Sequence, residues 1–460
     1  MKNHDFSGAR WLAQCAALLS LALLIMIAHT SVHAQAQAIL PNLIHHQSIG
    51  TVNCASSTCH GAIVPVPQGR IMQNEYTTWL RLDKHAKAYA VLLNGQSHAI
   101  MKNLGIKQPA HQAKLCLDCH AHNPPPALTG ERHITSDGIG CEACHGPAQK
   151  WIASHTLSDT PLTENLANGM YPTHQPIAQA KLCLSCHFGD SNRFVSHKLM
   201  AAGHPRISFE LESFAHIEPA HVRYGVDWQQ RKGSYNSIKI WAIGQALASK
   251  QLLDRLIHPK LGRDGLFPEL LLFDCHSCHH KMSEKKATPR LGLGPGQMRL
   301  NDSNLLMLRA IVATVAPAEA TALNQQIRLL HHAVVGNAEA KGANALELAQ
   351  QLGATIEQLS HQFETYPFDV AVLRKILQNL IAQAREGQYS DYAGAEQVYL
   401  SVSSLCASLN RQNGLRMTAK VNQQLSLMRK SLADEDKFQP QVFSTQLAAL
   451  QTLISPQVTP

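Results

Sequence analysis

The chain has 460 residues and a formal net charge of +8, and 45% of its residues are hydrophobic while only 5% are aromatic. This length favours two or three domains, and the low aromatic content leaves a core of that size short of apolar bulk. A basic chain can indicate a nucleic-acid binder. We exclude that class, because the motifs described below predict cofactors that carry opposing negative charge.

The first residues have the pattern of an export signal. Lys2 and Arg10 precede an apolar run over residues 11–28, and Val32-His33-Ala34 then comes before a run of Gln and Ala. This pattern predicts a secretory signal peptide over residues 1–34, cleaved near Ala34, and therefore a periplasmic protein. The run also reaches the length of about 18 apolar residues that a spanning helix needs, which leaves an uncleaved membrane anchor as an alternative.

Four Cys-x-x-Cys-His motifs follow in the mature chain. This spacing is typical of covalent heme c attachment, because two thiols must reach the vinyl groups of one porphyrin while the next His ligates its iron. A zinc site would need two such pairs and no obligatory His after them. The motifs are Cys116, Cys119 and His120; Cys141, Cys144 and His145; Cys183, Cys186 and His187; and Cys275, Cys278 and His279.

A widened motif precedes these four. It is the first in the chain, and the five motifs are numbered in chain order below. Cys54 and Cys59 are separated by four residues, and His60 follows directly. The alternative is a short disulfide in an exported protein. If the motif holds heme, Cys406 is the one mature-region cysteine outside a heme motif. We therefore expect five hemes, and at least four, whose propionates bring the net charge of the mature chain close to neutral.

Helical patterns are common along the rest of the chain, and strand signals are few. Apolar faces predict helices over residues 75–93 and 238–256, and the repeat Gln-Ala-Lys-Leu-Cys before two motifs predicts two short helices that end in heme sites. From about Leu300, amphipathic stretches predict an antiparallel helical bundle. We expect a mainly α protein, with a multiheme cytochrome c domain over residues 35–298 and a helical bundle over residues 299–460. The bundle stretches are 305–315, 339–363, 368–385, 393–409, 415–432 and 441–453.

Each proximal His fills one of two axial positions on its iron, so distal ligands must come from elsewhere. We predict three: His85 in the helical stretch between the first two motifs, His155 ten residues beyond His145, and His204 in a Gly-His-Pro turn. The surplus of histidines leaves other candidates open, including His98, His174, His197, His216, His221 and His258.

Taken together, these segments resemble a known family. The opening C-x₄-C-H-G, the runs NEYTTWLRLDKHAKAY and CLDCHA, and the runs DGIGCEACHGPA and MAAGHPRISFEL resemble multiheme cytochromes of the c-552/c-554-like group over residues 50–285. The resemblance implies mostly bis-His iron, with His85, His155 and His204 in distal positions. The widened first motif, the fifth heme and the long C-terminal region depart from that family.

Two functions remain open at this point. The first is an electron carrier between a membrane or periplasmic redox donor, such as a quinol oxidoreductase, and a terminal acceptor. The second is a reductase or oxidase of a small nitrogen or sulfur compound at a heme with an open axial site. A structural subunit of a larger respiratory complex, docked through the bundle or held at a membrane, is a third interpretation.

Overall fold

The computed structural model describes residues 38–265, 267–279, 290–294, 297–336, 342 and 344–458. The predicted signal peptide over residues 1–34 and its cleavage near Ala34 lie outside these residues. The described chain is mainly helical, as the sequence predicts. Its regular sheet is one antiparallel pair, β1 (Arg263–Asp264) with β2 (Phe267–Pro268).

Short helices make up the first part of the chain. They are α2 (Glu75–Leu82), α3 (Gly95–Asn103), α4 (Lys114–His120), α5 (Cys141–His145), α6 (Leu162–Ala167), α7 (Pro176–His187), α8 (His197–Ala201), α9 (Leu211–Ile217) and α10 (Val226–Lys232). Single 3-10 turns connect them: Pro41–Leu43, Thr51–Cys54, His85–Lys87, Ala90–Leu93, Pro126–Leu128, Thr135–Asp137, Ala148–Lys150 and Ser154–Thr156.

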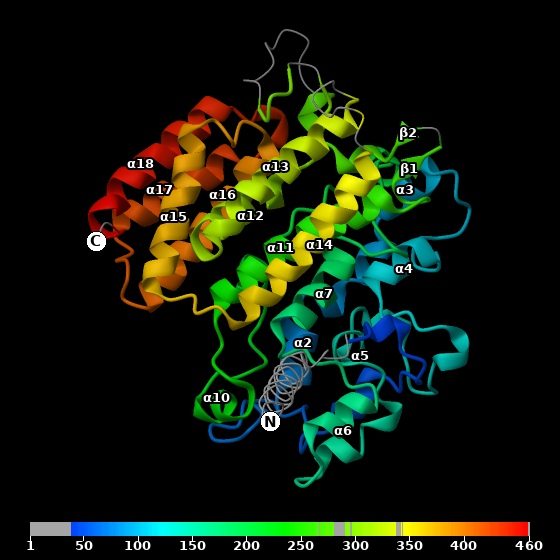
Figure 1. The fold of residues 1–460 in the computed structure, drawn as a ribbon. Coiled ribbons are helices and arrows are strands. Elements are labelled where there is room, and N and C mark those ends of the chain that lie inside the picture. Colours follow the sequence, from blue (N-terminus) through cyan, green and yellow to red (C-terminus); the bar gives the residue numbers. More distant parts are fainter. Residues whose placement is uncertain are drawn as a thin grey trace, which may run out of the picture. The chain divides into compact units, whose positions relative to one another are not determined.

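Long helices follow. They are α11 (Ser237–Ile257), α12 (Ser303–Val315), α13 (Pro317–Val334), α14 (Ala345–Thr365), α15 (Val370–Arg385), α16 (Tyr392–Arg411), α17 (Ala419–Ser431) and α18 (Pro440–Val458). Three more 3-10 turns are Leu270–Leu272, Cys275–Ser277 and Glu435–Lys437. Figure 1 shows the long helices gathered in one part of the molecule, with α5, α6 and α10 outside that group.

The predicted helices are mostly confirmed. Both copies of the Gln-Ala-Lys-Leu-Cys repeat lie on helices that end at a motif His, α4 at His120 and α7 at His187. The expected helix over residues 75–93 is wrong in its second half, because α2 ends at Leu82. Asp83 is extended there, and its carboxylate accepts the backbone N–H of His85. A carboxylate bound to a nearby backbone N–H competes with helix continuation in this way.

The long helices share one hydrophobic core, which is why they stay together. α11 packs against α14, α12 and α16, and Trp241 at its centre is fully buried. Since α11 precedes residue 299, this core includes a helix that the expected boundary places in the heme domain. Cys406 is fully buried beside Leu405 and Leu409, as expected. The boundary at residue 298 itself stays a prediction.

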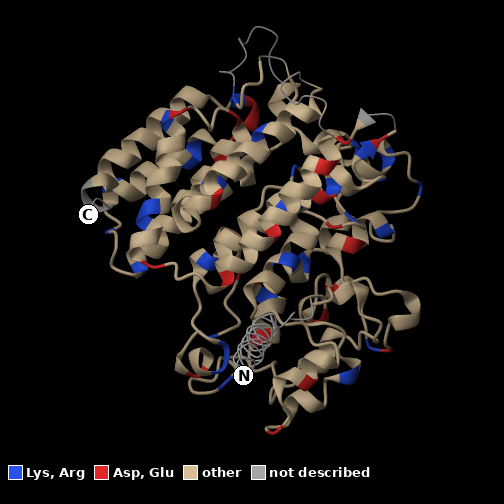
Figure 2. Cartoon of the chain, in the orientation of Figure 1, with Lys and Arg blue, Asp and Glu red and all other residues tan. Residues whose placement is uncertain are grey.

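The surface of the described residues carries both signs of charge. Figure 2 shows Lys and Arg positions interspersed with Asp and Glu positions along the ribbon of the helices. Among the helices in the described ranges, none combines the length and the hydropathy needed to cross a membrane.

Candidate heme sites

Four of the five predicted proximal histidines lie opposite a second histidine from a distant part of the chain. An iron–imidazole nitrogen bond of about 2 Å, plus about 1 Å from nitrogen to ring centre, puts two axial rings about 6 Å apart. The ring centroids are 6.4 Å apart for His60 and His155, 5.9 Å for His187 and His85, 6.3 Å for His120 and His204, and 6.2 Å for His279 and His197. The spacing therefore fits one iron between each pair of rings.

The structure brings the three predicted distal histidines into these pairs. His85 faces His187, His155 faces His60, and His204 faces His120. In each pair, the proximal His belongs to a motif other than the one that lies nearest to the distal His in the sequence. His204 follows Gly203, whose φ of +115° is a conformation that residues with a side chain rarely adopt.

The fourth facing residue, His197, was only one of several open candidates in the sequence. It begins α8 beside the capping residue Ser196, and its backbone N–H donates to the carboxylate of Glu269 at 2.7 Å. Glu269 precedes the fifth motif, so this bond holds His197 close to that motif. Sequence spacing carries no signal for such a contact.

Hydrogen bonds at Nδ1 orient most of these rings. His60 Nδ1 lies 3.0 Å from Glu75 and His85 Nδ1 lies 2.9 Å from Asp83. The Nδ1 atoms of His120, His155 and His204 lie 2.7–3.1 Å from the backbone oxygens of Ala88, Ile152 and Pro205. An engaged Nδ1 fixes the tautomer and leaves Nε2 as the metal ligand. The donor set therefore fits heme iron.

The carboxylates also change ring basicity. The bond to Glu75 raises the pKa of His60, and the bond to Asp83 raises the pKa of His85. A carboxylate partner makes an imidazole a stronger ligand, which stabilises ferric iron. By contrast, burial lowers the pKa of His187 to about 4, and the nearby His85 and His120 lower it further.

His145 is the exception among the proximal residues. Within the described residues, it has no facing His ring at the spacing of the other four pairs. It is partly buried, and burial lowers its pKa to about 4. The next largest effect on its pKa comes from His221, ahead of His60. His221 is exposed on the segment before α10.

The thiols of different motifs lie close together. Cys54 shares a hydrogen bond with Cys141, and Cys119 shares one with Cys186, which lowers the pKa of Cys186 to about 6. Cys144 and Cys183 are both partly buried, and burial raises the pKa of each to about 12. After burial, Cys183 has the largest effect on the pKa of Cys144. Cys54 and Cys59 remain free thiols in the structure and form no disulfide.

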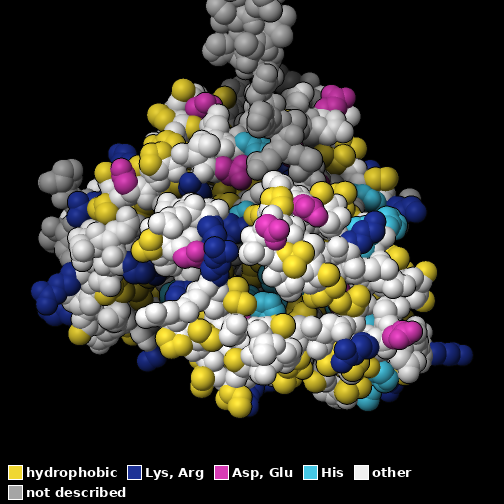
Figure 3. Space-filling model, turned by 90° about the horizontal axis from the view of Figure 1, so that it is seen from below, with side chains coloured by type: hydrophobic (Ala, Val, Ile, Leu, Met, Phe, Trp, Pro, Cys, Tyr) yellow, Lys and Arg dark blue, Asp and Glu magenta, His cyan; other side chains and the backbone are white. Residues whose placement is uncertain are grey.

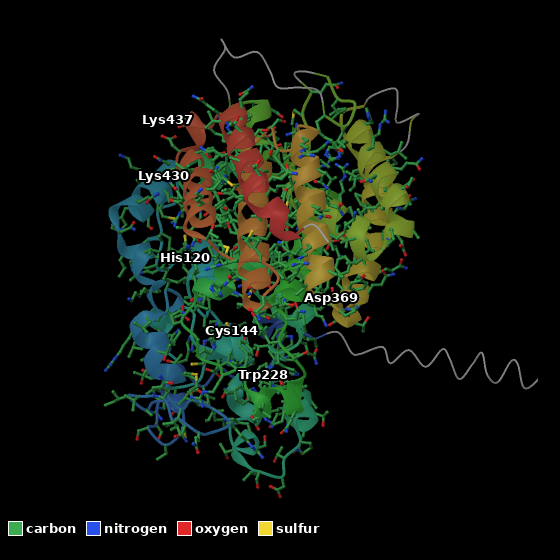
Figure 4. All side chains as sticks on the ribbon, turned by 90° about the vertical axis from the view of Figure 1, so that its left-hand side faces the viewer. His120, Cys144, Trp228, Asp369, Lys430 and Lys437 are labelled. Carbon is green, nitrogen blue, oxygen red and sulfur yellow. The ribbon has the colours of Figure 1, made fainter. Side chains whose placement is uncertain are left out.

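Glu142, inside the third motif, fixes that motif against the start of the described chain. Its carboxylate accepts the backbone N–H groups of Ile49, Gly50 and Ala148 at 2.7–2.9 Å. A carboxylate that accepts several backbone N–H groups makes charge-assisted hydrogen bonds, which are about twice as strong as neutral ones. Figure 4 labels Cys144 of this motif and His120 of the second motif, both on the short helices. The sequence gives no signal for this role of Glu142.

The fifth motif is tied to the long helices instead. Asp274, directly before Cys275, accepts from Arg299 at 3.0 Å, and Arg299 also binds Asp391 of the turn before α16 at 2.9 Å. Arg206, two residues after His204, pairs with Glu396 of α16 and with Glu435 at 2.8 and 3.0 Å. These ion pairs connect the residues beside the fifth motif and beside His204 to the long helices.

Comparison with known families agrees with part of this assignment. Residues 53–146 match the family described as cytochrome c554 and c-prime. This segment contains the first three motifs, and the expected resemblance over residues 147–285 lies outside it. No curated protein and no solved structure matches the chain. The match therefore supports a c-type cytochrome that binds heme c and carries electrons, and residues 53–146 of the chain are similar to the family of cytochrome c554 and c-prime.

Proposed function

We propose that this chain is an exported, five-heme electron carrier with bis-histidine iron at four or more of its hemes. The observation that carries the proposal is the set of four facing histidine pairs with centroids 5.9–6.4 Å apart. Iron held by His on both faces changes its geometry little between ferric and ferrous states. Such iron transfers electrons readily, and its potential is set by hydrogen bonds and burial.

The contacts between thiols support one order of hemes along the chain. Each thiol bonds to a vinyl edge of its own porphyrin, so thiols in contact bring two porphyrin edges together. The bonds of Cys54 with Cys141 and of Cys119 with Cys186, and the closeness of Cys144 to Cys183, join four hemes in this way. Named by their proximal ligands, the hemes follow the order His60, His145, His187, His120.

The fifth heme follows at the end of this order. Burial raises the pKa of Cys275 in the fifth motif and the charge of Arg206 opposes this rise, so these two residues lie near each other. Arg206 also lies two residues after His204, whose ring faces His120. The heme at His279 is therefore the neighbour of the heme at His120. Electrons would enter or leave at the His60 and His279 ends, and the latter lies beside the helical bundle.

We place this carrier in the periplasm, because heme c is attached outside the cytoplasm and residues 1–34 have the pattern of a signal peptide. Its partners would be redox proteins, either a membrane quinol oxidoreductase or an exported enzyme. Cell fractionation of the natural chain tests this placement: the heme-stained protein is expected in the periplasmic fraction, and recovery in the cytosol would contradict it.

Spin-state measurements test the ligand assignments. Electron paramagnetic resonance of the ferric protein should change on His204→Ala, with one low-spin heme becoming high-spin. The matched control is His98→Ala, because His98 is exposed on α3 and has no ring facing it among the described residues. A His204→Ala protein that stays low-spin at every heme would remove His204 from the ligand set.

Heme counting tests the widened motif. Replacing Cys54 and Cys59 by Ser should lower the number of covalent hemes from five to four, as measured by intact mass spectrometry. Replacement of Cys406 by Ser is the control, since this buried thiol lies in α16 and outside every motif. An unchanged count after the double substitution would show that the first motif holds no heme.

A further inference from the structure

The chain around His221 has an arrangement that the other distal candidates share. His221 Nδ1 lies 3.3 Å from the backbone oxygen of Pro219. His155 and His204 have the same type of contact, between Nδ1 and a carbonyl one to three residues away. This contact leaves Nε2 of His221 without an assigned role and orients the ring as a metal ligand requires.

Two anchors fix the course of the segment that carries His221. On one side, Glu218 Oε2 lies 3.9 Å from Nδ1 of His85, the ring that faces His187. On the other side, Arg223 donates to the backbone oxygens of Val66 and Pro67 at 2.9 and 3.0 Å. The segment therefore runs from the fourth motif to the loop that follows the first motif.

The third motif lies between those two ends. Just before this motif, the backbone N–H of Ile139 donates to the backbone oxygen of His85 at 3.0 Å, and the motif helix α5 packs against Thr51–Cys54 of the first motif. His221 is three residues from Glu218 and two from Arg223, and three residues of chain span at most about 10 Å. The middle of the anchored segment is therefore held within reach of the third motif, whose His145 has no facing His ring among the described residues.

We propose that His221 supplies the sixth ligand to the iron bound by His145, and that small heme ligands such as carbon monoxide, nitric oxide or cyanide displace it there. This inference rests on the proposed function, since it requires a heme on the third motif. His221 is exposed, whereas His85, His155, His197 and His204 are partly buried. A ligand on an exposed segment exchanges more easily than one held inside packed helices.

Ligand exchange needs no further reactant. The bond from His221 Nε2 to iron breaks and the bond from iron to the incoming molecule forms, without any transfer of electrons. The heme at His145 would then be the site at which this carrier senses or converts a small molecule. The other four hemes would keep both histidines.

The experiment uses the heme-loaded natural protein and the His221→Ala variant. The natural ferric protein should be entirely low-spin, and His221→Ala should make one heme high-spin, with a signal that shifts on addition of cyanide. His216→Ala is the matched control, because His216 is also exposed and lies on the same stretch but outside the two anchors. The proposal is overturned if every heme of the His221→Ala protein remains low-spin. It is also overturned if the natural protein already contains a high-spin heme and His221→Ala does not change that signal.

A second variant tests displacement without removing the ligand. Arg223→Ala removes two hydrogen bonds that hold the segment, so carbon monoxide should bind the ferrous protein about tenfold faster or more. Arg231→Ala is the control, because Arg231 pairs only with Asp227 of its own helix, in the exposed part of the described chain. Equal binding rates for both variants would contradict an anchored, displaceable ligand.

Heme counts separate this inference from the proposed function. A protein with five hemes and no spin change on His221→Ala contradicts the role of His221 alone. A protein that lacks a heme on Cys141 and Cys144, as peptide mass spectrometry would show, contradicts the five-heme proposal itself.

Discussion

The two parts of the described chain bury hydrophobic side chains to very different extents. The long helices share a continuous core in which many large residues are fully buried, such as Trp241, Leu308, Phe363, Leu377 and Val398. Around the first motifs, small groups form instead, one at Leu92, Met101 and Leu117 and another at Ile100, Val195 and Leu199. The long helices are thus stabilised by their own side chains.

The motif region leaves apolar side chains exposed. Ile63 is 75% exposed, Val64 69% and Leu82 65%. Figure 3, seen from below, shows hydrophobic and His side chains spread together over one face of the molecule. Covalent hemes would supply the apolar bulk that this region lacks, since each porphyrin is larger than any side chain. Bound heme would therefore hold the motif region together, whereas side-chain packing holds the long helices together.

The largest expected effect follows from withholding heme. If residues 35–460 are produced in a cytoplasm without heme attachment, the region from α2 to α6 should lose its fold while α11 to α16 keep theirs. The physical reason is that the small apolar groups near the motifs cannot offset the conformational entropy of ordering those loops. Hydrogen exchange with mass spectrometry measures the protection of backbone amides in each region. Equal protection of both regions would contradict the proposed dependence of the motif region on heme.

The buried ion pairs that join the two parts should give the next largest effect. Arg290 is nearly inaccessible and pairs with Asp302 and, at 3.1 Å, with Asp391. Arg290→Met would leave two buried carboxylates with fewer partners, so we expect a loss of about 3–5 kcal/mol in the free energy of unfolding. Urea unfolding of the heme-loaded protein measures it. Arg231→Met, on the exposed side of α10, serves as the control, and equal losses for both variants would argue against this network.

Glu212, on the helix α9 that leads into the bundle, should make stability depend on pH. Burial and the nearby Glu210 raise its pKa to about 7 from an ordinary 4.5. Because the folded state holds this proton more tightly than the unfolded state, the stabilisation is present below about pH 4.5. It is lost as pH rises to about 7, by about 3 kcal/mol at most.

Glu212→Gln should remove this loss, so the melting temperature of the variant relative to the natural protein should increase between pH 5 and pH 8. Glu319→Gln, at an exposed position of α13, is the control and should show no such trend. A constant difference between Glu212→Gln and the natural protein over this range would contradict the assignment.

The smallest effect is expected at the far surface of the bundle. Lys437, labelled in Figure 4, pairs with Asp434 at 2.7 Å, and both side chains are largely exposed. Exposed ion pairs contribute little to stability. Lys437→Ala should leave both the melting temperature and the heme spectrum unchanged, and a clear change in either would indicate a role at a redox interface.

The sequence predicted many of the helices correctly, and its prediction of the attachment residues has a clear physical basis. A porphyrin dictates the spacing of two thiols and a histidine, so the pattern around His120 or His187 can be read directly. Amphipathic periods likewise predicted α12, α15 and α16. The end of α2 at Leu82 was missed, because it depends on the bond between the Asp83 carboxylate and the backbone of His85.

The pairing of ligands could not be obtained from sequence. His155 follows His145 by ten residues but faces His60. His197 differs from His98 in its contact with Glu269 and in facing His279. Such choices depend on which loops lie together in three dimensions. The three predicted distal residues came from resemblance and turn chemistry, and their partners came from the fold.

The most direct test of this account is to locate iron in crystals of the mature protein by anomalous scattering at the iron edge. The account predicts five iron positions, four of them midway between the rings of the facing pairs and one beside His145. Fewer than five positions, or an iron with only one histidine where two rings face each other, would contradict it.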